Sequence, residues 1–167
     1  MAVSDYHLEF KGPDVKGESQ DDQFKEAVQL HNWSWNAANT ATHGYGSGGG
    51  HGKVSHGDFQ FQKDFDKASA ILIDKLNCGD HFKEVILHCR KKTGNDGKAL
   101  EFLKITMKKC TVTHYSGGGH DSAPTISESW GLGYEEIKFE YTEQKPDGTK
   151  GAVVQSAWNL AQNKKAA

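Results

Sequence analysis

The sequence predicts a mainly β protein, a compact β-barrel or sandwich of about seven or more antiparallel strands, with one α-helix and a long extended loop. Three observations favour this fold class. Apolar and polar residues alternate with a period of two along most of the chain, which is typical of half-buried strands. Turn residues separate the alternating segments at hairpin spacing. One segment has the period of a helix instead.

The N-terminal half contains three expected strands. Tyr6, Leu8 and Phe10 share one face of the first, and polar residues occupy the other face. A longer strand is expected from 24 to 36, and a short one at 58–61. Between the last two lies a stretch of about residues 39–56, rich in glycine and serine, which predicts an extended loop.

The strand at 24–36 changes phase in its middle. Val28 and Leu30 are even-numbered, whereas Trp33 and Trp35 are odd-numbered. A regular strand would place these pairs on opposite faces. Either a β-bulge near residues 31–32 resets the phase, or both faces are covered. The two tryptophans are expected in the core, because large aromatic side chains contribute most when they are buried.

A helix is expected over about residues 66–78. One face carries three large apolar residues: Leu72, Ile73 and Leu76. Asp66 or Ser69 can accept hydrogen bonds from the free amides of the first turn. Gly79 suits the left-handed conformation that commonly ends a helix.

Hairpins dominate the C-terminal half. Strands are expected at about 82–92, 100–115, 136–141 and 154–160. The turn at 93–97 contains Asn and Asp before glycine, which accept the positive φ of tight hairpins. Pro146-Asp147-Gly148 predicts the turn of the last hairpin.

Composition describes an ordinary soluble chain. Its 167 residues and 18.4 kDa predict one domain spanning residues 1–167. The formal charge of −2 lacks the basic excess of a nucleic-acid-binding protein. No leader and no membrane-spanning segment is visible. We therefore expect synthesis in the cytoplasm, no nucleic-acid partner, no membrane insertion, and any export to occur without a signal peptide.

No catalytic, cofactor or metal site is predicted. Gly44, Gly46 and Gly49 match a dinucleotide-binding spacing, but no helix follows to receive a phosphate. Histidines occur on or near glycine-rich stretches, at His43, His51, His56 and His120. Zinc requires three or four rigidly held ligands, which such stretches do not supply. The three cysteines form no C-x-x-C pair and are expected as free thiols.

Several motifs occur in a fixed order along the chain. Val15-Lys16-Gly17-Glu18-Ser19 precedes Trp33-Ser34-Trp35, and Lys63-Asp64-Phe65-Asp66-Lys67 leads into the expected helix. Gln144 to Thr149 and then Trp158-Asn159-Leu160 follow near the end. Each motif is short, but their order over about 150 residues resembles the Hcp family, the tube protein of the type VI secretion system. The helix start lacks the proline that many members carry.

The resemblance implies a structural protein and not an enzyme. Protomers would form a homohexameric ring, and stacked rings would form the inner tube that a contractile sheath expels, with small effector proteins carried in its lumen. Sheath, baseplate and spike proteins would be further partners, and no cofactor is implied. The protein would reside in the bacterial cytoplasm and then be secreted, or enter a target cell, without a signal peptide.

The resemblance also assigns residues to roles. The stacking loop would comprise Thr42, His43, Gly44, Tyr45, Gly46, Ser47, Gly48, Gly49, Gly50 and His51. Because the tryptophans alternate with polar residues, Asn32, Ser34 and Asn36 are candidates for the lumen wall. The family motif comprises Val15, Gly17, Glu18, Ser19, Trp33 and Trp35, with Glu18 expected to accept backbone amides or to pair with a basic group.

Two other classes of function stay open at this point. The chain could be a monomeric β-sandwich that binds a partner, which predicts no self-assembly. Alternatively, it could be a metal-dependent hydrolase that uses the histidines of the glycine-rich stretches, which predicts stoichiometric metal binding.

Overall fold

The computed structural model describes residues 4–40, 54–92 and 99–167. The described part contains one helix, α1 (Lys67–Cys78), and twelve strands. The strands are β1 (Ser4–Lys11), β2 (Val28–Leu30), β3 (Asn32–Ser34), β4 (Ala37–Asn39), β5 (Val54–His56), β6 (Phe59–Asp64), β7 (His81–Lys92), β8 (Ala99–Gly118), β9 (Ser127–Gly133), β10 (Glu136–Gln144), β11 (Lys150–Asn159) and β12 (Lys164–Lys165). The predicted mainly β fold is confirmed.

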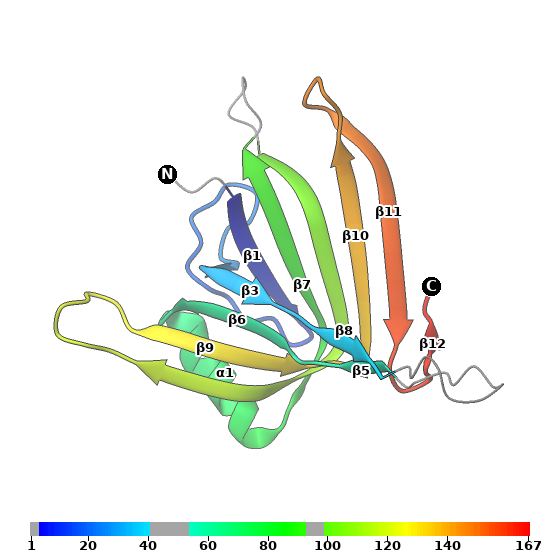
Figure 1. Ribbon diagram of the computed structural model, residues 1–167. Helices are drawn as coiled ribbons and strands as arrows, with labels where there is room; N and C mark the ends of the chain where they lie inside the picture. The colour runs from blue at the N-terminus through cyan, green and yellow to red at the C-terminus, as the bar shows by residue number, and fades with distance from the viewer. Residues whose placement is uncertain (1–3, 41–53, 93–98) are drawn as a thin grey trace.

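Ten strands belong to one antiparallel sheet that folds over itself. Its main path runs β12-β11-β10-β8-β7-β1-β2, and β3, β6 and β9 join it through β8. The long strand β8 pairs with β7 and β10 over its first part and with β9 over its last part. Figure 1 shows β3, β6 and β9 crossing the lower ends of β7, β8 and β10, with α1 beside them. The result is a barrel-like body with β4 and β5 as a separate two-stranded sheet.

The core lies between these two groups of strands. Alternation brings Leu8, Leu87 and Ile105 together on adjacent strands, and all three are fully buried. The shorter strands contribute large aromatic side chains, and the helix contributes Leu72: Phe59, Phe61, Trp130 and Leu72. Trp33 and Trp35 are half-buried and pack against this core.

The strand expected at 24–36 is not continuous. It is divided into β2, β3 and β4, with a bend at His31. Before the bend β2 pairs with β1, and after it β3 pairs with β6. The backbone N–H of His31 donates to Gln62 O at 2.8 Å. The phase change therefore marks a change of partner strand, and each half of the segment turns its own apolar residues toward the core.

Both ends of α1 agree with the sequence prediction, and Asp66 and Ser69, the two candidates for capping its first turn, both take part. Asp66 is the N-cap, and its Oδ1 accepts from the N–H of Ala68 at 3.0 Å. Ser69 completes a capping box, because its Oγ accepts from the N–H of Asp66 at 3.0 Å. Gly79 ends the helix at φ 69°, in the left-handed region.

The predicted hairpins are found with small shifts of their ends. At the last one, Gly148 has φ 85° and its N–H donates to Lys145 O at 2.9 Å. The predicted turn at 93–97 lies outside the described residues, although β7 and β8 pair as expected up to Lys92 and Ala99. Strand β9 is not among the predicted strands, because its glycines obscure the alternation of Trp130 and Leu132.

Candidate functional site

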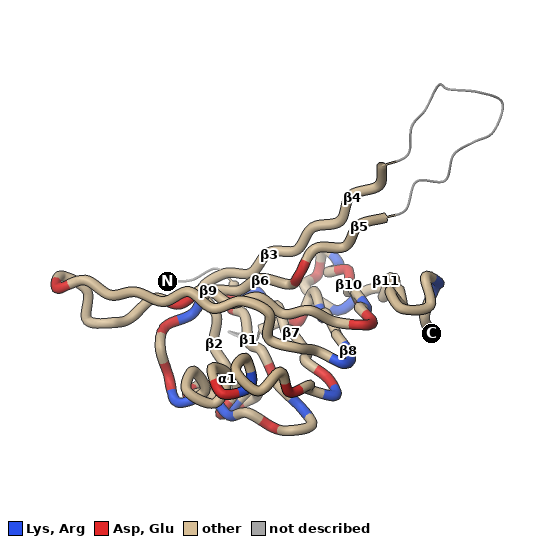
Figure 2. Tube along the Cα trace, turned by 90° about the horizontal axis from the view of Figure 1, so that it is seen from below, with Lys and Arg blue, Asp and Glu red and all other residues tan. Residues whose placement is uncertain are grey.

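A two-stranded hairpin leaves the barrel between β3 and β6. Its strands pair Ala37 with His56 and Asn39 with Val54. The three residues of β4 are all exposed. Figure 2 shows β4 and β5 projecting beyond the body. They are the two ends of the predicted loop at 39–56, whose stacking residues, 42–51, lie outside the described residues.

The root of this hairpin is held by a short hydrogen-bond relay. Trp35 Nε1 donates to the hydroxyl of Tyr134 at 2.5 Å, and this hydroxyl donates to Gly57 O at 2.8 Å. Gly57 N–H donates to Asn36 O at 2.9 Å, which joins the two strands below β4 and β5. The rings of Trp35 and Phe139 pack at 4.9 Å between centroids. Burial raises the pKa of the Tyr134 hydroxyl, which keeps it protonated.

A small cavity of about 210 Å³ lies beside the root. Most of its lining is aromatic or aliphatic: Trp35, Val54, His56, Ile137, Phe139, Ser156 and Trp158. The indole N–H of Trp158 is buried without a hydrogen-bond partner in the described structure. The cavity therefore has room for one small, mainly apolar group.

The outer face of the β3–β6–β9 layer is polar and uncharged at its centre. Asn32 lies opposite Gln62, and Ser34 lies opposite Gln60. All four are exposed, and Asn32 Nδ2 donates to Gln62 Oε1 at 2.7 Å. Asn36 is exposed as well, whereas Trp33 and Trp35 point inward. We call Asn32, Ser34, Gln60 and Gln62 the neutral polar face. The alternation predicted for this strand is confirmed, while its role as a lumen wall stays a prediction.

The Val15–Ser19 motif fixes the chain that follows β1. Val15 and Ser19 are buried, and the N–H of Gly17 donates to Glu26 O at 2.7 Å. A Cβ at Gly17 would lie 2.5 Å from Ala27 O, so a side chain has no room there. Glu18 is exposed, and no partner of its carboxylate is seen in the described part of the chain. The expected pairing of Glu18 is therefore not found.

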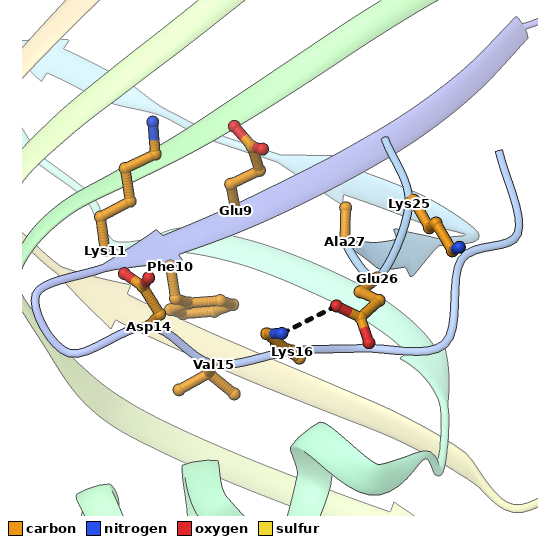
Figure 3. Close-up of a pocket in the computed structure, with 9 residues that line it drawn as sticks. All are labelled: Glu9, Phe10, Lys11, Asp14, Val15, Lys16, Lys25, Glu26 and Ala27. Carbon is orange, nitrogen blue, oxygen red and sulfur yellow. Dashed lines mark ion pairs between the residues drawn. The ribbon is translucent and has the colours of Figure 1, made fainter. Parts of the chain in front are cut away.

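A second hollow, of about 200 Å³, lies beside this motif (Figure 3). Lys16 Nζ pairs with Glu26 there at 2.9 Å. This ion pair raises the pKa of Lys16 and lowers the pKa of Glu26. The remaining charged groups of the wall are Glu9, Lys11, Asp14 and Lys25. Three cations and three anions therefore share one open wall, and no excess charge is present to select a ligand.

Sequence reasoning missed a buried polar network below the neutral polar face. Lys63 is fully buried, and its Nζ donates to Ser69 Oγ at 2.6 Å and pairs with Asp66 at 2.7 Å and Glu128 at 2.9 Å. Glu128 also accepts from Tyr115 and Trp130. Alternation could have revealed it, because Lys63 has the parity of Phe59 and Phe61. The network joins α1 to β6, β8 and β9.

A second polar cluster, also missed, covers the opposite face of β1, β7 and β8. Arg90 pairs with Asp5 at 2.9 Å and also with Asp21. His88 lies between Glu9 at 3.0 Å and Glu101 at 2.6 Å. The ring of Phe24 covers both, 4.4 Å from His88 and 4.9 Å from the Arg90 guanidinium. The ion pair of Arg90 with Asp21 and the packing of Phe24 fasten the 21–24 segment to the sheet.

The histidines considered as metal ligands are not brought together within the described residues. His43 and His51 lie outside the described residues. His56 lies in β5, and His120 is exposed, 2.8 Å from Ser122 Oγ. Within 4–40, 54–92 and 99–167 no group of three or more His, Cys, Asp or Glu is placed to hold a metal ion. Cys78, Cys89 and Cys110 are free thiols, and burial raises the pKa of both Cys89 and Cys110 to about 12.

No helix in the described ranges has the length and apolar character needed to span a membrane. The hairpin, the neutral polar face and the buried ion-paired network together define a mainly β, barrel-like protein with a projecting two-stranded element.

The chain belongs to the Hcp family of the type VI secretion system, because the sequence model of that family, described as "Type VI secretion system effector, Hcp", matches residues 7–141. It is 35% identical over 151 residues to protein hcp1 of Pseudomonas aeruginosa, covering 90% of this chain and 92% of that protein. Its fold is similar to the crystal structure of Hcp1 from Salmonella typhimurium, with a TM-score of 0.79, 30% identity, and 99% and 100% of the two chains covered. A solved type six secretion system protein has a TM-score of 0.87 at 26% identity, over 97% and 99% of the chains.

Proposed function

We propose that this protein is the tube subunit of a type VI secretion system. Six copies close into a ring, and rings stack into the inner tube that the contractile sheath expels, with effectors carried in its lumen. Sheath, baseplate and spike proteins are its other partners, and the protein leaves the cell without a signal peptide. The observation that carries this proposal is the β4–β5 hairpin, which projects beyond the body with all of β4 and Ser55 of β5 exposed.

An isolated two-stranded hairpin is at best marginally stable in water. The exposed residues of β4 make no core of their own. A neighbouring copy that covers this hairpin would supply the missing packing, and contact through one projecting element and a different receiving surface joins copies head to tail, within a ring or from one ring to the next. The hairpin therefore supports self-assembly better than binding by a lone monomer.

The outer edge of β11 provides a second contact surface. One side of β11 pairs with β10, and on the other side β12 pairs only with Trp158 and Asn159 in the described structure, so residues 150–156 have no strand on that outer side. Val153 and Val154 are 58% and 68% exposed on this edge. Long exposed edges with apolar side chains are association sites unless something covers them. We assign this edge to a subunit boundary.

We assign the neutral polar face, together with Asn36, to the lumen wall. Its amide and hydroxyl groups form hydrogen bonds with many surfaces, but they exert no long-range attraction or repulsion on a charged cargo. A wall of this kind suits transport of effectors with different net charges. Transport of this type requires binding and release only, so we assign no catalytic step and no cofactor to this protein.

The test is the mass of the purified full-length protein in solution. Light scattering behind size-exclusion chromatography should give six times the 18.4 kDa chain mass, and electron microscopy of the same fraction should show rings. A single 18.4 kDa species at every concentration would contradict the proposal and favour the monomeric binding module. Stoichiometric zinc or nickel in that monomer would favour the hydrolase instead.

The proposed role of the loop is tested separately. Replacement of residues 42–50 by a short Gly-Ser linker should leave rings intact and reduce their stacking and secretion. Stacking and secretion equal to those of the unaltered protein would remove the loop from the mechanism and leave the ring proposal standing.

A further inference from the structure

The two chains of the β4–β5 hairpin enter and leave the barrel at one point. Trp35 and Asn36 precede β4, and Gly57 follows β5. A Cβ at Gly57 would lie 1.8 Å from the side-chain Oδ1 of Asn36 and 3.3 Å from its backbone O, so the Asn36 side chain occupies the space beside Gly57. The hydroxyl of Tyr134, in the chain between β9 and β10, contacts both sides of this root.

The position of this hydroxyl differs from that of an ordinary packing contact. It accepts from the indole of Trp35 on the incoming side at 2.5 Å and donates to the carbonyl of Gly57 on the outgoing side at 2.8 Å. One oxygen therefore holds both ends of the hairpin to the barrel. The small cavity beside Trp35 leaves space into which the root can tilt when that oxygen is removed.

We propose that the Tyr134 hydroxyl is a latch that fixes the direction in which the β4–β5 hairpin leaves the barrel. Tyr134 is thus a positioning residue, which acts through Trp35 and Gly57. Its consequence for ring stacking rests on the proposed function, whereas its effect on the hairpin itself does not. A hairpin that points in one direction before contact loses less conformational entropy when a neighbouring copy binds it.

The state of the latch does not change with pH near neutrality. Burial of the phenol raises its pKa above the ordinary value of 10.0, so the hydroxyl keeps its proton to donate to Gly57 O. The hairpin is therefore latched both in the cytoplasm and outside the cell.

The test compares two single-atom deletions. Tyr134→Phe removes the latch oxygen and keeps the ring, while Tyr115→Phe removes a hydroxyl that donates to Glu128 at 3.1 Å inside the barrel. Hydrogen–deuterium exchange is followed in peptides that cover 37–39 and 54–57. We expect exchange there to be faster by about fivefold or more in Tyr134→Phe, because two hydrogen bonds are lost, and unchanged in Tyr115→Phe. Equal exchange in both variants would overturn the latch.

A second variant protects the test against a folding defect. If Tyr134→Phe does not fold, Trp35→Phe removes the indole donor on the incoming side, and the same increase in exchange is expected. Unchanged exchange at the hairpin in Trp35→Phe would then count against the latch.

The assembly measurement separates this inference from the function on which it draws. Faster hairpin exchange in a chain that never forms rings would support the latch and contradict the tube. Normal rings and stacks with unchanged hairpin exchange in Tyr134→Phe would support the tube and contradict the latch.

Discussion

Lys63 is a charged residue in the least exposed part of the barrel. Its ammonium group is fully buried together with the carboxylate of Glu128, 2.9 Å away. Asp66 and Ser69 satisfy its remaining protons. A buried ion pair is costly to desolvate and is tolerated only when every partner is present. Loss of one member therefore leaves an unpaired charge inside the protein.

We expect Lys63→Met to lower the free energy of unfolding by about 3–5 kcal/mol, because Glu128 is left buried without its cation. The double variant Lys63→Met/Glu128→Gln should recover part of this loss. Urea unfolding followed by circular dichroism measures both. As a control, Lys16→Met removes one member of an exposed ion pair and should cost much less stability than Lys63→Met. If Lys63→Met and Lys16→Met lose similar amounts of unfolding free energy, the buried ion pair of Lys63 is no more important for stability than an exposed one.

The pair of Arg90 and Asp21 makes stability depend on pH. The hydrogen bond from Arg90 lowers the pKa of Asp21 from its ordinary 3.8 to about 2. A carboxyl group whose pKa is lower in the folded state stabilises that state above its unfolded pKa, and the contribution is lost as pH falls through the folded value. The contribution of Asp21 to the free energy of unfolding is therefore complete above about pH 4 and disappears toward about pH 2.

The neighbouring His7 adds a second pH dependence. Burial lowers its pKa in the folded state, so protonation of this histidine also disfavours the folded state as pH falls below its ordinary pKa of 6.5.

Asp21→Asn should remove one part of this acid sensitivity. We expect the difference in unfolding free energy between the unaltered protein and the variant to be constant from pH 5 to 7 and to shrink between about pH 4 and pH 2. Chemical denaturation at a series of pH values measures that difference. A difference that stays constant down to pH 2 would mean that Arg90 does not perturb Asp21.

At the scale of elements, the helix shows how local chemistry sets a boundary. Gly79 takes φ 69° at the C-terminus of α1, and its N–H donates to Lys75 O at 3.0 Å. A Cβ at this position would meet no atom within 4 Å. Any cost of a larger residue here is therefore conformational and not steric.

Gly79→Ala should lower the free energy of unfolding by about 1 kcal/mol, which is the cost of holding a non-glycine residue in the left-handed region. Gly118→Ala is the matched control, because its Cβ also meets open space but its φ is not positive. Thermal unfolding compares the two variants. If both variants change stability equally, the left-handed conformation is not what the glycine at the helix end provides.

The strands show where local patterns stop being sufficient. Alternation and turn residues correctly indicated β1, β7, β8, β10 and β11, because each is a long strand of eight or more residues. It indicated the phase change within residues 24–36, but not that the chain moves from β1 to β6 at His31. It also failed at β9, where glycines replace the side chains that would have marked the faces.

At the scale of the whole molecule, exposed apolar side chains gather at the end of the β10–β11 hairpin. Tyr141 lies opposite Val154, and these residues are 48% and 68% exposed. Side chains of this size are normally covered when they sit next to an unpaired strand edge. We expect a neighbouring copy to cover them in the ring.

Val154→Lys should leave the unfolding free energy of the isolated chain within about 0.5 kcal/mol, because the site is exposed. It should also lower the fraction of ring at a given concentration, because a lysine must then be desolvated at the subunit boundary. Analytical ultracentrifugation measures the ring fraction. Ile71→Lys on α1 is the control, since Ile71 is 43% exposed on a different element. An equal loss of ring in both variants, or none in either, would remove β11 from the boundary.

The sequence by itself determined the period of most strands, both ends of the helix and the family. The strand periods and helix ends depend on residues a few positions apart, and the family is recognised from short continuous motifs such as Val15–Ser19. Only the tertiary structure decided that the second strand changes partner at His31, that Lys63 meets Glu128, and that Tyr134 holds the root of the hairpin. Each of these contacts joins residues about 30 to 100 positions apart, and local periodicity carries no information on which distant strand a residue will face.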